Sequence, residues 1–376
     1  MAAIAAIGAG ADDDTEEDIA YSTVDVDILR LSPYSDGVQL PDGRVVFVPY
    51  TATTIGLFDP ATNAYSTIAA NAPGDYAYRG GLLLPDGRVL FVPHYATTIG
   101  IFNPTTNAYS TIAGMPGEAA YASGVLLPDG RVLFVPASAT TIGIFNPTTN
   151  AYSTIATDAP GHNAYVGGVL LRDGRVVFVP YNATTIGMFN PATNEYSTIA
   201  GAPGRDAYRG GVQLSDGRVV FFPYNATTIG IFNPTTNAYS TIARTPGDSA
   251  YNGGALLPDG RVLFVPYGTT KIGIFNPATN AYKTIAPGPQ SRYAHLSGVL
   301  LNDGRVLFTP HDVKKIGILT VSDEKARRRA HARTEGVKAE LVAAAWHPTR
   351  MARWCLDEDE RRELADMGLC DATATA

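Results

Sequence analysis

The tripeptide Asp-Gly-Arg recurs seven times along this chain of 376 residues. The seven copies begin at Asp42, Asp86, Asp129, Asp173, Asp216, Asp259 and Asp303. Successive copies are 43 or 44 residues apart. A period this regular indicates one supersecondary unit repeated seven times, so the fold follows from the structure of that unit.

The fourth unit contains four runs rich in β-branched and aromatic residues, each bounded by Gly, Pro or Asn. They cover residues 164–171, 173–180, 184–190 and 195–200. Asp-Gly between the first two runs is typical of a type I′ hairpin, and Asn-Pro after the third starts a further turn. The unit therefore predicts a four-stranded antiparallel meander.

The second run of this unit, Val176 to Val179, is apolar on both faces. Such a strand belongs to a sheet that neighbouring sheets cover on both sides. Four strands in about 43 residues with two buried faces describe a blade of a β-propeller. We predict an all-β, seven-bladed β-propeller over residues 20–322, and the 38 Gly and 26 Pro of the chain agree with its many turns.

The seventh unit lacks its fourth strand, because no Asn-Pro turn follows residues 315–320. A matching strand, Ala20 to Val24, stands at the other end of the propeller region. Tyr21 precedes Asp42 by 21 residues, the spacing that also separates Tyr65 from Asp86. We therefore expect the N-terminal strand to complete the last blade and to close the ring, which removes two free sheet edges.

Two propeller families resemble these units. Residues 289–306 and 58–63 resemble parts of kelch units, although kelch units carry a Gly pair and a Trp where this chain has Val-Pro and Tyr. The Asp-Gly step, an apolar strand and then Ile-Gly-Ile-Phe-Asn-Pro resemble the repeats of streptogramin lyases. The resemblance covers residues 20–321 and implies the propeller fold rather than an activity.

Function is expected where the units differ. The loops from strand two to strand three and from strand four to the next blade emerge on one face, and the variation concentrates there. Arg79 and Arg209 occupy equivalent positions at the start of strand one and should point toward the mouth of the channel. The candidate binding residues are Arg79, Arg209, Asn252, Tyr181, Tyr224, His94, His295 and His311.

This face predicts a non-enzymatic binding scaffold that recognises a protein, a peptide or a small anionic ligand, because guanidinium groups bind oxyanions in pairs of hydrogen bonds. No catalytic residue, metal ligand or cofactor is predicted. The alternative is a metal-dependent lyase or hydrolase. Streptogramin lyases bind magnesium and use His and Glu on one face. By this resemblance, the enzyme hypothesis needs His295 and His311 to hold a metal with Asp312 or another acid.

The charge of the chain narrows the choice of partner. The net charge is −7, and eight acidic residues with no basic one lie within residues 1–27, so the propeller itself is nearly neutral. A neutral surface disfavours nucleic acid, and no apolar run approaches the ~20 residues of a membrane helix. We expect a monomer.

Both cysteines, Cys355 and Cys370, lie in the tail, which favours a cytoplasmic location and leaves a nuclear or secreted one open.

The two ends differ from the propeller in composition. Residues 1–19 carry the acidic run Asp12 to Asp18 and predict a disordered lead-in. Residues 323–376 are rich in Glu, Arg, Ala and Leu and predict a helical tail. Residues 345–360 of this tail resemble a short motif of proteins from large algal DNA viruses.

Overall fold

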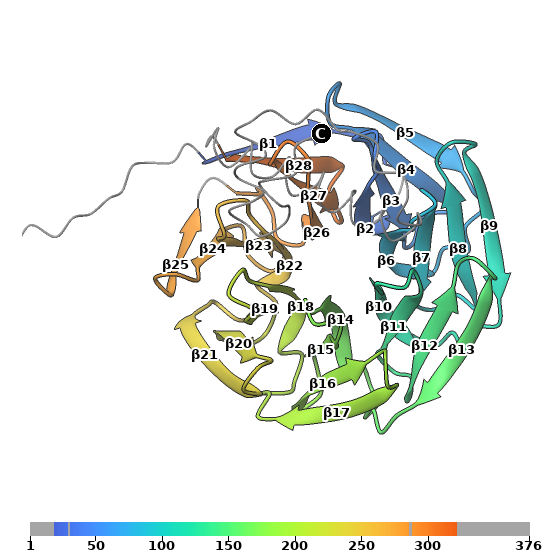
Figure 1. Cartoon of the computed structure of the whole chain (residues 1–376). Helices are drawn as coiled ribbons and strands as arrows, with labels where there is room; N and C mark the ends of the chain where they lie inside the picture. Colours follow the sequence, from blue (N-terminus) through green and yellow to red (C-terminus); the bar gives the residue numbers. More distant parts are fainter. Residues whose placement is uncertain (1–18, 29–30, 286–287, 322–376) are drawn as a thin grey trace, which may run out of the picture.

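The computed structural model describes residues 19–28, 31–285 and 288–321. These residues form seven four-stranded antiparallel sheets arranged as blades around a central axis (Figure 1). The fold is the predicted all-β, seven-bladed propeller. The predicted disordered N-terminus and helical tail lie outside the described residues. No helix within the described ranges is long and apolar enough to span a membrane.

Each blade has four strands, ordered from the innermost strand at the axis to the outermost strand at the rim. The innermost are β2 (Tyr34–Gln39), β6 (Tyr78–Leu83), β10 (Tyr121–Leu126), β14 (Tyr165–Leu170), β18 (Tyr208–Gln213), β22 (Tyr251–Leu256) and β26 (His295–Leu300). The second are β3 (Val45–Pro49), β7 (Val89–Pro93), β11 (Val132–Pro136), β15 (Val176–Pro180), β19 (Val219–Pro223), β23 (Val262–Pro266) and β27 (Val306–Pro310). The third are β4 (Thr54–Asp59), β8 (Thr98–Asn103), β12 (Thr141–Asn146), β16 (Thr185–Asn190), β20 (Thr228–Asn233), β24 (Ile272–Asn276) and β28 (Lys315–Val321). The outermost are β5 (Ala64–Ala69), β9 (Ala108–Ala113), β13 (Ala151–Ala156), β17 (Glu195–Ala200), β21 (Ala238–Arg244), β25 (Ala281–Ile285) and β1 (Ile19–Asp25).

The ring closes through β1, as the spacing of Tyr21 predicts. This strand pairs antiparallel with β28, so the last sheet has the order β1-β28-β27-β26 (Figure 1). Tyr21 lies opposite Leu319 in the register. The two ends of the propeller region are thereby joined in one sheet.

Buried tyrosines connect the inner and outer strands of each blade. In blade one, Tyr34 on β2 forms a 2.7 Å hydroxyl–hydroxyl hydrogen bond with Tyr65 on β5. Gly56 lies between them on β4, where an added Cβ would stand 2.9 Å from the Tyr34 hydroxyl. The Ile-Gly-Ile pattern therefore makes room for this pair. The same pairing recurs in blades two to six.

The Asp-Gly-Arg turns lie on one face of the ring, which we call the turn face. The type I′ prediction is wrong. Leu40 accepts a 2.9 Å hydrogen bond from the Gly43 amide, and within this turn Gly43 alone has a positive φ, of 91°. Because a type I′ turn needs positive φ at both central residues, the single positive φ at Gly43 means that the chain forms a three-residue loop with glycine in the left-handed position instead.

The arginine of each of these turns forms an ion pair with the aspartate of the same turn, at 2.6 to 2.7 Å. In four blades it also donates to the carbonyl of the Asn-Pro or Asp-Pro turn in the next blade. These acceptors are Pro147, Pro234, Pro277 and Pro60. The repeated tripeptide is thus a turn that also connects neighbouring blades.

Candidate functional site

The opposite face, which we call the pocket face, carries the loops that differ between blades. Arg79 and Arg209 are each the second residue of an innermost strand, on β6 and β18. In both strands the register shifts at this point, and the glycine that follows each arginine, Gly80 or Gly210, has a positive φ. Such a bulge turns a side chain away from the sheet.

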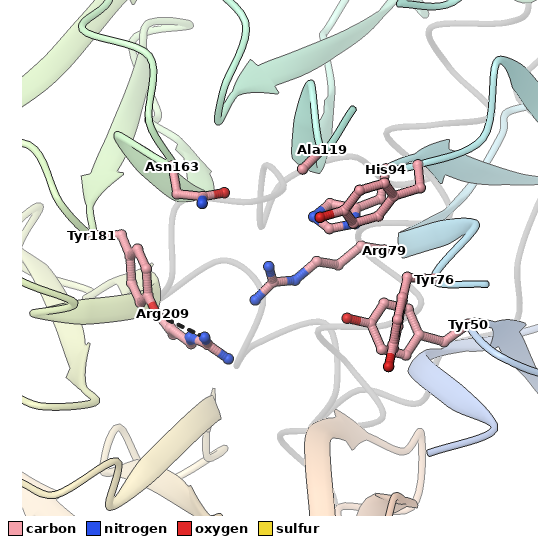
Figure 2. A pocket seen from close by; sticks show the side chains of 9 residues that line it. Tyr50, Tyr76, Arg79, His94, Ala119, Asn163, Tyr181 and Arg209 are labelled. Carbon is pink, nitrogen blue, oxygen red and sulfur yellow. Dashed lines mark hydrogen bonds between the residues drawn. The ribbon is translucent and has the colours of Figure 1, made fainter. Parts of the chain in front are cut away.

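Both arginines line one cavity of about 240 Å³ on the pocket face (Figure 2). The cavity is lined by Tyr50, Tyr76, Arg79, His94, Tyr95, Ala119, Asn163, Tyr181 and Arg209. Figure 2 shows the Arg79 guanidinium projecting into the space between these side chains. None of the described residues that line it is acidic. We call this cavity the arginine pocket.

Arg209 is held in place on several sides. One of its terminal nitrogens donates to the Asn252 side-chain oxygen at 2.6 Å, and the other donates to the Tyr181 hydroxyl at 2.8 Å. The guanidinium also lies 4.0 Å from the centroid of the Tyr224 ring, which is a cation–π contact. Asn252 is fixed in turn by a 2.8 Å hydrogen bond to the Leu296 carbonyl.

Arg79 has no such partners. Among the described residues, no hydrogen bond or ion pair reaches its guanidinium. Burial, together with the charge of Arg209, lowers the pKa of Arg79 to about 10. Arg79 remains charged at neutral pH, so the pocket holds two positive charges and one guanidinium whose donors are available.

His94 lies beside Arg79 and is 5% exposed. Neither of its ring nitrogens has a hydrogen-bond partner among the described residues. Burial lowers the pKa of His94 to about 3, and the charge of Arg79 adds to this effect. The nearby Tyr76 backbone acts in the opposite direction on this pKa but does not meet the geometry of a hydrogen bond. The imidazole is therefore neutral at physiological pH.

Aromatic side chains surround the mouth of the ring. The residue directly after strand two is aromatic or His in six blades: Tyr50, His94, Tyr181, Tyr224, Tyr267 and His311. Their rings contact one another in two arcs, Tyr50 with His94 and Tyr181 through Tyr224 and Tyr267 to His311. Blade three has Ala137 at this position, which leaves a gap between the arcs.

The eight residues expected on the pocket face fall into three groups. Arg79, Arg209, Tyr181 and His94 line the pocket. Asn252 and Tyr224 contact the Arg209 guanidinium without lining the pocket themselves. His295 and His311 do not line it.

His295 was expected in or beside a loop of the pocket face, but it is the first residue of β26. It is 1% exposed and occupies the place of the inner tyrosine in blade seven, where its Nε2 lies 2.7 Å from the Tyr21 hydroxyl. His311 is buried, and its Nδ1 lies 3.1 Å from the Tyr293 carbonyl and 3.0 Å from the Asp312 carboxylate. No group of three or more His, Cys, Asp or Glu within the described part of the chain is arranged to hold a metal ion.

The sequence reasoning missed several lining residues. Tyr76 and Tyr95 are 49% and 52% exposed, and Tyr76 has a φ of 63°, which is unusual for a bulky side chain. Ala119 and Asn163 occupy the equivalent positions in the next two blades, also with positive φ. An alignment of the seven units at the residue two before the inner tyrosine or histidine would have found this ring of loop residues.

No protein-family model and no curated protein matches the chain. Solved structures do match. A streptogramin B lyase aligns with a TM-score of 0.68 at 18% identity, over 81% of this chain and 98% of that one. A virginiamycin B lyase from Staphylococcus aureus aligns with a TM-score of 0.67 at 17% identity, over 80% and 99%. The WD40 propeller domain of Doa1 aligns with a TM-score of 0.65 at 13% identity, over 81% and 98%.

At these identities the matches show the fold alone. The fold resemblance to streptogramin lyases expected from the repeats is thereby confirmed, and the resemblance of short stretches to kelch units stays a prediction. The viral motif of the tail lies outside the described residues.

Proposed function

We propose that this protein is a non-enzymatic binding scaffold whose pocket face recognises an anionic group of a protein, a peptide or a small ligand. The observation that carries the proposal is the Arg79 guanidinium, which is half-buried beside a second arginine and has no carboxylate among the described residues to pair with. A desolvated charge without a partner is costly to the free protein. A carboxylate bound to Arg79 would offset that cost.

The surroundings of the pocket fit a recognition surface. Tyrosine and arginine are the residues that most often dominate binding energy at interfaces. Here Tyr76 and Tyr95, which line the pocket, are exposed large side chains. Arg209 is fixed before any ligand arrives, because Asn252 and Tyr181 hold it, and a preorganised donor loses little entropy on binding.

Titration calorimetry with a hexaglutamate peptide tests the proposal, with a hexalysine peptide as the negative probe. We expect only the acidic peptide to bind, and its affinity to fall at least about tenfold in the Arg79→Ala/Arg209→Ala double variant, since hydrogen bonds to charged groups contribute about 1.5–3 kcal/mol each. Alanine is compatible with the fold at this position, because blade three has Ala122 there.

Arg292→Ala is the matched control. Arg292 is an exposed arginine of the same face, paired with Asp248 at 3.0 Å, and it does not line the pocket. Its removal lowers the net charge by the same unit as either single substitution but should change the affinity less than twofold. Equal losses in the Arg292 and double variants would mean that the face attracts anions without a specific site.

The alternative, a metal-dependent lyase or hydrolase, requires histidine nitrogens that are free to ligate. The contacts of His295 with Tyr21 and of His311 with Tyr293 support a structural use of both instead. Titration with Mg²⁺ and Mn²⁺ separates the two proposals. Tight binding that His311→Ala abolishes would favour the enzyme.

A further inference from the structure

We infer that the ligand of the arginine pocket is a small hydroxycarboxylate, whose carboxylate binds Arg79 and whose hydroxyl binds His94. The inference rests on the proposed function and narrows it to one chemical class. It starts from Arg79 and His94, two neighbouring side chains of the pocket that have no hydrogen-bond partner among the described residues.

His94 is the first of these side chains. Both of its ring nitrogens are buried and have no partner among the described residues, and the ring is part of the pocket lining. A buried polar side chain normally has a partner, so an unpartnered one at a cavity wall points to a ligand. Arg209 repeats the pattern on the other side, where its Nε is buried without a partner.

The charge state of His94 decides which group it can bind. A neutral imidazole has one N–H donor and one bare nitrogen that accepts. A carboxylate only accepts, and an ammonium only donates, so each matches one of the two nitrogens. A hydroxyl both donates and accepts and can satisfy either of them. The pairing of His94 with Arg79 therefore fits a molecule with a hydroxyl close to its carboxylate.

The walls of the cavity set the size of this molecule. A cavity of about 240 Å³ lies below the 300–1,000 Å³ that is usual for drug-sized ligands. The rings of Tyr50, Tyr76 and Tyr181 line it and offer apolar surface to a short carbon skeleton. No described lining residue is acidic, so a second carboxylate on the ligand meets no repulsion and can face Arg209.

The test compares malate with succinate, because these four-carbon dicarboxylates differ by one hydroxyl. We expect titration calorimetry on the full chain to show malate binding about tenfold more tightly than succinate, since His94 is already desolvated and a hydrogen bond made there is gained at little cost. In His94→Phe, which keeps a ring of similar shape, the two acids should bind with equal affinity. Arg79→Ala should weaken both.

Two further variants keep the test decisive. His94→Ala repeats the comparison with the residue type that blade three has at this position, Ala137, and covers the case in which Phe disturbs the packing. His162→Phe changes an exposed histidine of the same face and should retain the full malate preference.

Equal binding of malate and succinate by the wild type, or a malate preference that survives in both His94 variants, overturns the inference. So does the absence of binding by either acid up to about 10 mM, the weakest affinity that calorimetry resolves here. In each of these cases the hexaglutamate titration still decides the proposed function by itself.

Discussion

The two faces of the propeller use arginine in opposite ways. On the turn face, seven arginines each pair with an aspartate two residues earlier, and the Arg175 guanidinium lowers the pKa of the Asp173 carboxylate. On the pocket face, Arg79 has no carboxylate among the described residues, and its own pKa is lowered by burial. Repeated arginines therefore serve assembly of the ring, whereas Arg79, which departs from the repeat, has donors that are available to a ligand.

The ring must be closed for either face to exist, so the largest effect is expected from removing the closing strand. Deletion of residues 1–27 removes β1 and with it the Tyr21–His295 hydrogen bond, and exposes the edge of β28. We expect the melting temperature to fall by more than about 10 °C, or the protein to associate through the open edge. Differential scanning calorimetry and size-exclusion chromatography measure both.

Deletion of residues 1–18 is the control, because it leaves β1 in place. It should change the melting temperature by less than about 2 °C. If both deletions behave alike, β1 does not hold the ring closed.

The next prediction compares the effect on stability of removing one arginine from each face. Arg88→Ala on the turn face removes an ion pair with Asp86 and a 3.0 Å hydrogen bond to the Pro147 carbonyl, and should lower the free energy of unfolding by about 1 kcal/mol. Arg79→Ala should leave it unchanged or raise it by about 1 kcal/mol, because it removes an unpaired, desolvated charge. Urea denaturation of the two variants provides the comparison.

The affinity for hexaglutamate should respond to the two substitutions in the opposite order to the stability. Arg79→Ala should weaken the hexaglutamate peptide, and Arg88→Ala should not. A variant that loses both stability and affinity would show that the two faces are not separate in function.

The buried histidines His94 and His295 predict a loss of stability in acid, and burial lowers the pKa of His311 in the same direction. The pKa of His94 is lowered to about 3 and that of His295 to about 4, from 6.5 in an unfolded chain. The unfolded state therefore binds more protons below pH 6.5, and the free energy of unfolding should fall by about 1 kcal/mol per pH unit for each histidine between pH 6.5 and 4. Above pH 6.5 this contribution is constant.

His295→Tyr checks this cause, because tyrosine occupies the equivalent position in the other six blades. Urea denaturation at pH 7 and pH 5 should show a smaller loss in the variant, by about 2 kcal/mol. The same slope in both proteins would assign the acid sensitivity to other groups.

The smallest effect is expected beyond the propeller. A chain that ends at Ser322 keeps all 28 strands of the described residues, so it should remain folded and soluble with both faces intact. Circular dichroism and the hexaglutamate titration are the measurements. Unfolding of this shortened chain would place the domain boundary elsewhere.

The sequence predicts most of the fold because the repeat fixes it. The 43- or 44-residue period, the apolar second strands and the spacing of Tyr21 each correspond to something the structure shows. The turn type was wrong because the prediction used Asp-Gly alone. Asp-Gly also fits a three-residue loop that ends with glycine in the left-handed position, and this loop forms both after Pro41 and after Arg172.

The site is predictable only in part, because cavities depend on how loops fold. Arg79 and Arg209 converge because equivalent positions of the repeat face one opening, which a comparison of units can find. The unpartnered state of His94 and the supports of Arg209 depend on side-chain contacts between blades. His295 carried a usable signal, since it replaces the repeated tyrosine and therefore inherits its partner, Tyr21.

The most direct test of the contrast between the faces is a crystal structure of the full chain grown with malate. The account predicts one malate in the arginine pocket, with a carboxylate within about 3 Å of the Arg79 guanidinium and a hydroxyl within about 3 Å of a His94 nitrogen. The arginines of the turn face should keep their aspartate partners. Malate bound to those arginines, or a structure in which Arg79 contacts no anion, would contradict the account.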